Sequence, residues 1–410
     1  MVASLQSVVH TAPTESVMAS LTMPLRWPET SAYLERVISR FGLNLQLQTV
    51  EWGELWPTVS QSAFTKKGAV VAEIGSTWLQ SLVGMHALKP INKEDALTLG
   101  GEAAYVKAAW DSCHVRGNAT LWSIPWSADV RVIYFWRDML EAAGVNPQFA
   151  FDTHPHMMNT LEQLREAGYE TPWVVETSRN NNPLENAASW LWKNGGCFVS
   201  QDGRRAAFTA EPALNGLMEY FSLLRYYPAE AGILNEGQAN TWFAERKAAV
   251  TMSGPWLLNH LSKYQSQDML DVVGIALPPG PSFVGGTHLA VMAHISPKVE
   301  RQVMELCLFL GSENTQRELI PLMNVLPVRK SILRDPFYAQ NPHLSVMVQA
   351  LKHGKLMPNV PRWTIIEDRL MDAFAVISQD ILQQGSSQIS QTVDKRLKTV
   401  AARLNMVLSQ

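Results

Sequence analysis

The chain has 410 residues, a length that favours two lobes over a single core. Of these residues 46% are hydrophobic and 17% charged, a composition typical of a folded globular protein. The formal net charge of −3 provides no basic field, which argues against a nucleic-acid-binding protein. No apolar run reaches the length that a bilayer-spanning helix needs.

Helices and strands alternate in the first part of the sequence. Residues 31–41 place apolar side chains at helical spacing, and residues 43–50 alternate apolar and polar side chains as a strand with one buried face does. Residues 70–74 predict a short apolar strand that leads into Ser76, Thr77 and Trp78, and residues 79–87 predict a helix. This alternation indicates an α/β lobe with a largely parallel sheet.

A second group of elements follows in the middle of the chain. It comprises a long apolar strand across 121–135, helices at 137–144, 160–168, 184–192 and 210–226, a short strand at 173–176 and a polar turn at 180–183. His154 and His156, the only close histidine pair, are predicted to lie in a loop with Asp152. A solvated loop is the simpler interpretation and a weak metal site the alternative, so we predict neither a metal nor a cofactor.

The remaining elements include one distinctive run, from residue 243 to Trp256. It predicts a helix end, a short buried strand and a Gly-Pro turn that presents an indole ring. Beyond it, strands are expected at 272–277 and 289–293 and a helix at 299–310. The last hundred residues are expected to be helical except for the Pro-rich break 358–361.

Two segments rich in Gly, Pro and Ser, 123–130 and 278–287, are predicted to pass between the lobes, with a third passage near 324–334. The lobes would then be discontinuous, with residues 1–126 and 286–328 in the N-terminal lobe and residues 127–285 and 329–410 in the C-terminal lobe. A cleft above two such passages has the geometry of a hinge that closes on a ligand.

Tryptophan is the unusual residue of the composition, with 14 in the chain. Many stand beside Pro, Gly, Ser or acidic residues, where strands turn into loops. Aromatic faces at such places suit the apolar C–H faces of sugar rings. The alternative for each ring is that it covers the surface of a lobe.

Six segments resemble, in order, stretches of the extracellular solute-binding proteins of ABC importers, in the sugar-binding family 1 group. They are IPWSADVRVIYFWRDMLEAAGV (124–145), SWLWKNGGCF (189–198), FAERKAAVTMSGPW (243–256), GGTHLA (285–290), LPVRKS (326–331) and PRWTIIE (361–367). The similarity extends over roughly residues 70–375. The first sixty residues depart from the family, which usually opens with a strand ending in Trp and a Gly-rich turn.

The resemblance implies an α/β, two-lobed type II periplasmic-binding-protein fold, in which each lobe is a mostly parallel sheet flanked by helices. It also implies a monomer that captures a mono- or oligosaccharide by lobe closure and delivers it to an ABC permease, without catalytic residues. The expected location is periplasmic or extracellular, with or without a membrane anchor. The predicted ligand contacts, including three N-terminal residues that we add (Trp27, Glu29 and Glu51), are Trp27, Glu29, Glu51, Ser76, Thr77, Trp78, Asp129, Trp192, Trp256, Gly285, Gly286, His288 and Trp363.

Several of these residues have a structural alternative. Asp129 accepts hydrogen bonds from sugar hydroxyls in one interpretation and pairs with Arg131 in the other. Gly285 and Gly286 offer backbone N–H groups to a ligand or simply give the hinge its freedom. His288 is either a contact or a loop histidine whose hydrogen bonds are satisfied within the protein.

Three other functions remain open from the sequence. An enzyme would need Asp129 with a second carboxylate in the cleft, but no nucleophile, zinc or phosphate-binding motif occurs. An intracellular sugar sensor fits the lack of Lys or Arg before Arg26, since an export signal begins with positive charge. A non-sugar solute such as a polyamine or ferric ion is the third. The three cysteines, odd in number and far apart, indicate neither a zinc site nor a disulfide framework.

Overall fold

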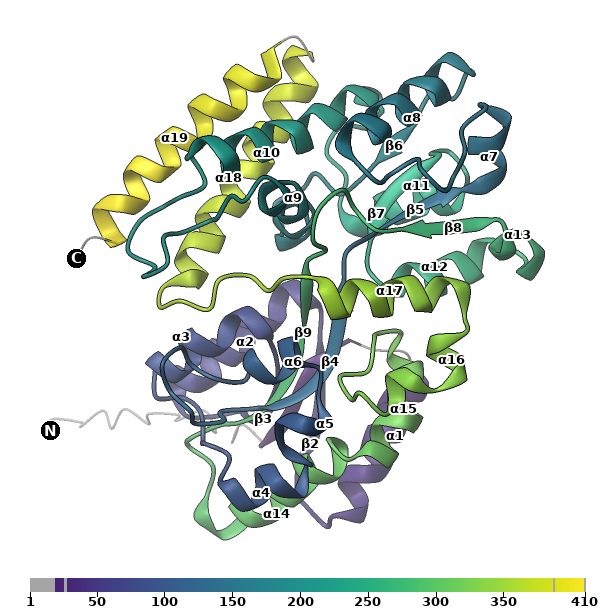
Figure 1. Cartoon of the computed structure of the whole chain (residues 1–410). Coiled ribbons are helices and arrows are strands. Elements are labelled where there is room, and N and C mark those ends of the chain that lie inside the picture. Colours follow the sequence, from purple (N-terminus) through teal and green to yellow (C-terminus); the bar gives the residue numbers. More distant parts are fainter. Residues whose placement is uncertain (1–18, 26–27, 386–387, 409–410) are drawn as a thin grey trace, which may run out of the picture.

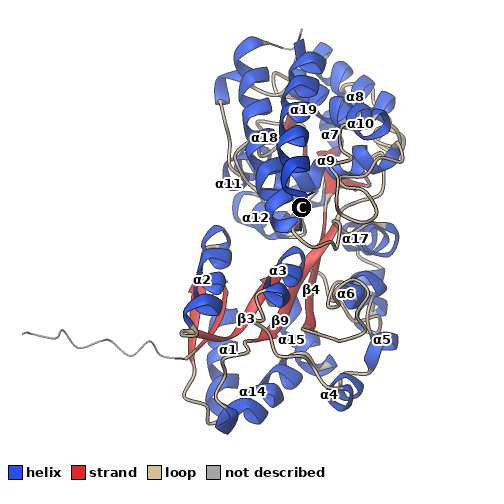
Figure 2. Ribbon diagram, turned by 90° about the vertical axis from the view of Figure 1, so that its left-hand side faces the viewer, coloured by secondary structure: helices blue, strands red, loops and turns tan. Residues whose placement is uncertain are grey.

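The computed structural model describes residues 19–25, 28–385 and 388–408, and it consists of two lobes, each built on its own β-sheet (Figure 1). The first sheet has the strand order β2-β1-β3-β9-β4, and the second has the order β6-β7-β5-β8. Helices surround both sheets, as Figure 2 shows. The predicted two-lobed α/β fold is confirmed.

The first sheet combines three parallel strands with two that pair antiparallel. Strands β1 (Ser20–Pro24), β2 (Gln46–Val50) and β3 (Ala69–Gly75) run parallel, and β9 (Val284–Val291) lies antiparallel between β3 and β4 (Ile124–Val130). β1 is buried along its whole length because it lies between two strands, whereas β2 forms the edge and stays partly exposed. The strand predicted at 43–50 is β2, which begins three residues later than predicted, at Gln46.

The second sheet is smaller and its pairing is mixed. β6 (Trp173–Val174) and β7 (Val250–Ser253) are parallel, and β5 (Val132–Trp136) pairs antiparallel with both β7 and β8 (Val273–Ala276). The predicted parallel pairing thus applies to one strand pair here. Both antiparallel pairs involve β5, which continues directly from β4 of the other sheet.

Two neighbouring segments of the chain connect the first sheet to the second. β4 continues into β5 with only Arg131 between them, and β8 leads back into β9 through residues 277–283. The register pairs Asp129 with Gly285 on one side of the passage and Ile133 with Ala276 on the other. The 278–287 segment predicted as a passage is therefore already strand from Val284 on.

The helices of the lobe drawn below in Figure 1 come from two separate parts of the sequence, before β4 and after β9. They are α1 (Pro28–Arg40), α2 (Trp52–Thr65), the 3-10 turn η1 (Ser76–Trp78), α3 (Leu79–Gly84), α4 (Lys93–Thr98), α5 (Gly101–Ala104), α6 (Lys107–Asp111), α14 (Pro297–Leu310), α15 (Glu313–Met323), η4 (Ile332–Arg334) and α16 (Pro336–Ala339). The predicted lobe boundary after residue 328 stays a prediction. Arg329 and Lys330 nevertheless donate hydrogen bonds to Tyr105 and Ala103 of this lobe.

The upper lobe contains the remaining helices. They are α7 (Arg137–Ala142), α8 (His154–Glu166), α9 (Asn181–Lys193), α10 (Glu211–Ser222), η2 (Leu223–Tyr226), η3 (Ala229–Ala231), α11 (Glu236–Ala244), α12 (Trp256–Tyr264), α13 (Gln267–Asp271), α18 (Trp363–Gln384) and α19 (Ile389–Leu408). α17 (Pro342–His353) contacts both β4 and β8 and so spans the junction between the sheets.

Capping residues explain where helix starts differ from the sequence prediction. α8 begins at His154 because Thr153 accepts a hydrogen bond from the His156 amide, and proline in the first turn is compatible with a helix. The histidine pair therefore lies in a helix, and the predicted loop is wrong. Likewise Asn180 caps α9, so the predicted polar turn at 180–183 is mostly the first turn of that helix.

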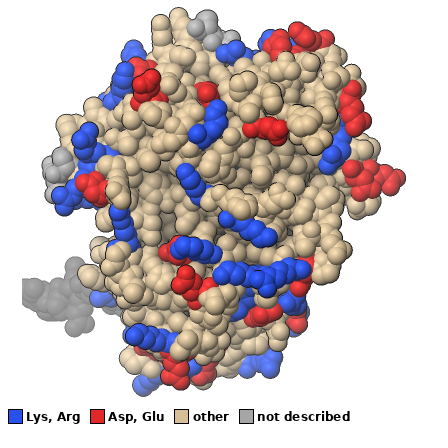
Figure 3. All heavy atoms as spheres, in the orientation of Figure 1, with Lys and Arg blue, Asp and Glu red and all other residues tan. Residues whose placement is uncertain are grey.

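Several observations bear on the protein's environment. Figure 3 shows basic and acidic side chains interspersed over one face of the molecule, in line with the small net charge. Cys113 and Cys307 are buried, Cys197 is exposed, and all three are free. Within the described ranges, no helix combines the length and apolar character that crossing a bilayer requires.

Candidate functional site

Functional side chains gather where parallel strands of the first sheet end. β2 ends at Val50 and is followed by Glu51 and Trp52, and β3 ends at Gly75 and is followed by η1. In α/β sheets the carboxyl ends of parallel strands form the edge at which ligands bind. Thr77 and Ser76, both partly exposed, lie at this edge as predicted.

An aromatic cluster lies at the same edge. The ring of Trp78 stacks on Trp52 with centroids 5.2 Å apart and is tilted against Trp56 at 5.5 Å. Trp78 is only 9% exposed, whereas Trp52 and Trp56 are half-buried and present part of their surface. The exposed aromatic surface is therefore provided by two residues that the sequence analysis did not choose. Their spacing of four residues directly after a strand was the available signal.

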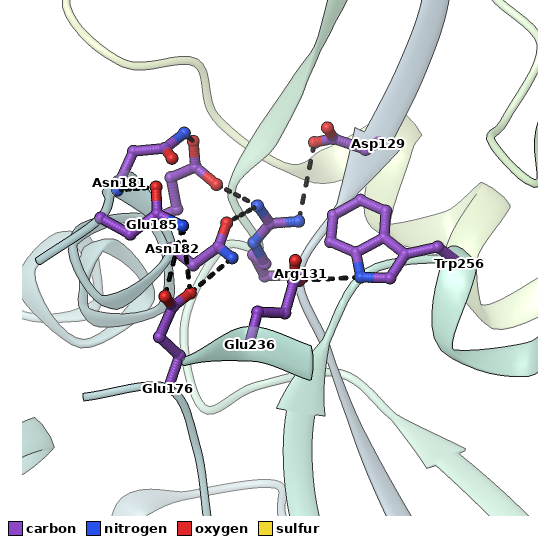
Figure 4. Close-up of polar contacts among 9 residues, drawn as sticks. Asp129, Arg131, Glu176, Asn181, Asn182, Glu185, Glu236 and Trp256 are labelled. Atoms are coloured by element: carbon purple, nitrogen blue, oxygen red, sulfur yellow. Dashed lines mark hydrogen bonds and ion pairs between the residues drawn. The ribbon is translucent and has the colours of Figure 1, made fainter. Parts of the chain in front are cut away.

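The second sheet forms a matching edge. β6 and β7 are parallel, and Glu176 and Trp256 follow their carboxyl ends. Arg131 reaches the same edge from the opposite direction, because it precedes β5 and Val132 pairs with Ser253 at the end of β7. The first turn of α9 adds amide side chains, as Figure 4 shows.

Arg131 is the centre of this edge. It is 3% exposed, and its Nη2 donates to Asn182 Oδ1 at 2.8 Å and forms an ion pair with Glu185, which is 4% exposed. Its Nη1 lies 4.0 Å from Asp129 Oδ1 of β4. The guanidinium thus joins a strand of the first sheet to α9 of the upper lobe (Figure 4). Sequence reasoning considered Arg131 only as a partner of Asp129 and missed this role.

Further hydrogen bonds fix the acidic side chains around it. Glu176 accepts from Ser178 Oγ at 2.6 Å and from Asn182 Nδ2 at 2.7 Å, and Asn181 Nδ2 donates to Glu185 Oε1 at 2.6 Å. Buried charges persist in proteins when they are paired and hydrogen-bonded in this way. The network is therefore a rigid wall of the site.

Trp256 lies beside this wall, half-buried at the start of α12. Its Nε1 donates to Glu236 Oε1 at 2.8 Å, and the Arg131 guanidinium lies over the ring at 4.7 Å from the centroid. The ring also lies against Gly254, where an added Cβ would come within 2.3 Å of it. The predicted indole is thus at the strand edge, and it is held there by a cation and by Glu236, which the sequence analysis missed.

Burial changes the titration of the carboxyl groups. It raises the pKa of Glu185 to about 7 in spite of the Arg131 guanidinium, and it raises the pKa of Glu236 to about 7. It also raises the pKa of Asp129 and, with a contribution from the Glu185 charge, brings the pKa of Glu367 to about 8. The site has more carboxylates than cations.

Hydrogen bonds link the two lobes beside the lower edge, among them Ser81 with Thr364 and Thr77 with Glu367. Thr77 Oγ1, on η1 of the lower lobe, donates to Glu367 Oε2, on α18 of the upper lobe, at 3.3 Å. Residues 356–359 lie against η1 as well, and together they line a small cavity with about 20 Å³ of space for the centre of a water-sized sphere. The predicted contact Thr77 therefore faces the opposite lobe.

The two predicted glycines lie on β9, paired with β4. Gly285 pairs with Asp129, and Gly286 has φ +140°, with an added Cβ only 2.1 Å from the Ser127 carbonyl oxygen. β4 and β9 therefore approach so closely that a side chain at 286 has no room. This steric reason for glycine was not part of the sequence analysis, and the ligand contact and the hinge freedom considered there both stay predictions.

Three predicted contacts are buried in the core. The Nε2 of His288 lies 2.9 Å from Ser112 Oγ and its Nδ1 lies 3.2 Å from Ser123 Oγ, and burial lowers its pKa to about 3. Trp192, 8% exposed, and Trp363, 1% exposed, both meet Phe198 edge-on. Both ring nitrogens of His288 are thus paired within the protein.

The other predicted N-terminal contacts are less informative. Glu29 and Glu51 are exposed at the first turns of α1 and α2, and Trp27 lies outside the described residues. Within the part of the chain that the structure describes, no group of three or more His, Cys, Asp or Glu side chains is placed to hold a metal ion.

Two lobes on separate sheets, joined by paired strands and with polar and aromatic side chains at facing strand edges, define a two-lobed binding protein. The family model for bacterial extracellular solute-binding proteins matches residues 33–346, and the chain belongs to this family. The predicted resemblance is confirmed, and the chain's relatives are binding proteins.

Individual relatives are distant in sequence and close in fold. A putative binding protein of Brucella abortus (strain 2308) is 20% identical over 396 residues, covering 93% of this chain and 91% of that protein. An ABC transporter solute-binding protein from Thermotoga lettingae, solved with α-D-tagatose, has a TM-score of 0.80 at 17% identity over 95% of this chain and 99% of its own. The sugar-binding protein MalE of Xanthomonas citri has a TM-score of 0.76 at 19% identity, with the same coverage.

Proposed function

We propose that this protein is the solute-binding subunit of an ABC importer and captures a sugar or polyol between its lobes. The observation that carries the proposal is the meeting of two strand edges, one with the exposed rings of Trp52 and Trp56 and the other with Trp256 beside Arg131. Indole faces suit C–H surfaces of a sugar ring, and charged groups form strong hydrogen bonds with its hydroxyls. The names of the similar structures point to the same class of ligand.

In this proposal the ligand contacts come from both lobes. Arg131 and Trp256 bind from the upper edge, Asp129 binds from the end of β4 in the first sheet, and Ser76 and Thr77 bind from the lower edge together with the aromatic cluster. The passages at Arg131 and before β9 form the hinge, close to the boundaries predicted at 126/127 and 285/286. The third crossing, predicted at 328/329, would lie after α16, because η4 and α16 belong to the lower lobe. The protein would act outside the cytoplasm as a monomer, deliver its ligand to a membrane permease and carry out no reaction.

The test is thermal stabilisation and tryptophan fluorescence over a panel of monosaccharides, oligosaccharides and polyols. A ligand that binds only the folded state raises the melting temperature in a saturable manner. We expect a hit that is lost in Trp256→Ala and kept in Trp110→Ala, a matched control because Trp110 is also half-buried and stacks on a neighbour, Tyr105. A panel without any response, or a response that both variants retain, would contradict the proposal.

The competing functions have their own readouts. An enzyme would convert the bound sugar, which chromatography of the ligand after incubation detects. A binder of polyamines or ferric ion would respond to those solutes while the carbohydrate panel stayed silent. An intracellular sensor would bind the sugar yet fail to stimulate the ATPase activity of a reconstituted permease.

A further inference from the structure

A small cavity lies inside the upper lobe next to Trp256. Its walls include Arg131, Glu176 and Glu236, of which Arg131 and Glu236 also contact the Trp256 indole. It offers about 10 Å³ to the centre of a water-sized sphere, which is close to the space that one water molecule needs. The cavity therefore suits one water-sized polar group at the end of a ligand rather than the whole molecule.

Buried polar atoms without partners line this cavity. Asn186 is 2% exposed and Ser253 is 4% exposed, and neither Asn186 Oδ1 nor Ser253 Oγ has a hydrogen-bond partner among the described residues. A buried polar atom without a partner is unfavourable, so such atoms in a native protein call for an explanation. Asn186 Oδ1 is an acceptor and Ser253 Oγ can also accept, so a group that brings hydrogen-bond donors would satisfy both atoms.

The charges around the cavity point the same way. Glu176 and Glu236 line it, Glu185 and Asp129 contact Arg131, and that guanidinium is the cation they share. Four carboxylates against one cation leave an excess of negative charge when all are ionised. A neutral hydroxyl group does not offset this excess, whereas an ammonium group does so and donates three hydrogen bonds.

We propose that the solute carries a protonated amino group, as an amino sugar or an amino polyol does, and that this group enters the cavity between Glu236 and Asn186. The proposal rests on the proposed function, because it names the chemical class of the solute that the same site captures. The remaining hydroxyls of the ligand would then reach Trp256 and the facing strand edge.

Binding of a cation in this cavity should be accompanied by the release of protons. Burial raises the pKa of both Glu185 and Glu236 to about 7, so near neutral pH these groups hold part of a proton. A cation that enters the cavity favours their ionised form and releases protons to the buffer. Isothermal titration in two buffers with different ionisation enthalpies measures this release.

The experiment compares matched ligand pairs with the full-length protein. Glucosamine is set against glucose and N-acetylglucosamine, galactosamine against galactose, and glucamine against sorbitol, with Kd from titration and thermal shift. We expect the amine to bind about tenfold or more tightly than its uncharged partners, as charge-assisted hydrogen bonds in a buried site do.

Two variants localise the effect. Glu236→Gln is expected to weaken amine binding roughly tenfold more than binding of the parent sugar, because it removes one negative charge from the cavity. Glu245→Gln is the control: Glu245 directly follows α11, is exposed and pairs with Lys247.

The outcomes separate the two proposals. Neutral sugars that bind as tightly as their amines, or N-acetylglucosamine that matches glucosamine, would overturn the amine inference and leave sugar capture intact. Silence of both the neutral and the amino series would overturn the proposed function together with the inference. If Glu236→Gln does not fold, the ligand pairs on the unmodified protein decide the question alone.

Discussion

Replacing Glu367 with glutamine is expected to stabilise this protein above neutral pH. Glu367 is 4% exposed on α18 and accepts a hydrogen bond from Thr77, which glutamine also accepts through its amide oxygen. Burial, together with the nearby charge of Glu185, raises the pKa of the Glu367 carboxyl to about 8 from an ordinary value of 4.5. The carboxyl is therefore protonated in the folded protein at pH 7.

The sign and size of the effect follow from proton linkage. The unfolded chain loses this proton near pH 4.5 and the folded protein only near pH 8, so stability falls as the pH rises between these values and is level above them. At about 1.4 kcal/mol for each pH unit, the loss reaches up to about 5 kcal/mol. A glutamine does not titrate and avoids this loss.

The assay is urea unfolding followed by tryptophan fluorescence from about pH 5 to about pH 9. The unmodified protein should lose stability with rising pH more steeply than Glu367→Gln, and the two curves should meet at the acid end. Asp368→Asn is the matched control, because Asp368 is the next residue and forms an exposed ion pair with Arg179. Superimposable pH profiles for the protein and Glu367→Gln would refute the argument from buried charge.

Three further substitutions test the packing of the site. Arg131→Met is expected to lower the free energy of unfolding by about 3–5 kcal/mol, because it leaves Glu185 buried without its cation. In a double-mutant cycle, adding Glu185→Met should restore most of this loss, and additive effects of the two substitutions would contradict the argument. Trp78→Ala should lower the free energy of unfolding by about 3–5 kcal/mol and reduce the near-ultraviolet circular dichroism of the aromatic cluster. A loss below about 1 kcal/mol would show that the neighbouring rings move into the space and would contradict the prediction. Gly286→Ala should destabilise by more than about 1 kcal/mol in thermal melting, while Gly53→Ala, with open space around it in α2, should not; equal effects would remove the steric argument.

Much of the fold could be predicted from the sequence because hydrophobic period and turn residues are local signals. The strand at β3 and the helix at α14 lie within three residues of their predicted ends. Predicted helix starts were wrong where the polar residues that cap a helix resemble those of a turn. Asn180 and the asparagines after it read as a polar turn, yet they begin α9 because the Asn180 side chain caps the helix.

The candidate site was harder to predict because burial is a tertiary property. Trp192, Trp256 and Trp363 all stand beside turn or loop residues in the sequence, but only Trp256 keeps an exposed part at a strand edge. Glu236 and Arg131 meet although they are more than a hundred positions apart, and no local pattern signals that they meet. The site residues that the sequence analysis missed are therefore those that only tertiary contacts bring to the strand edge of the second sheet.

The single residue between β4 and β5 has a consequence for how occupancy is sensed. Arg131 is at once the covalent joint of the two sheets and the holder of Asn182 and Glu185 on one side and Trp256 on the other. No loop lies there to absorb a rotation, so any change in the angle between the sheets must turn the backbone that carries the guanidinium. If the solute binds as proposed, the residue at which the sheets turn also contacts the solute, so solute binding and lobe movement would be coupled at a single residue.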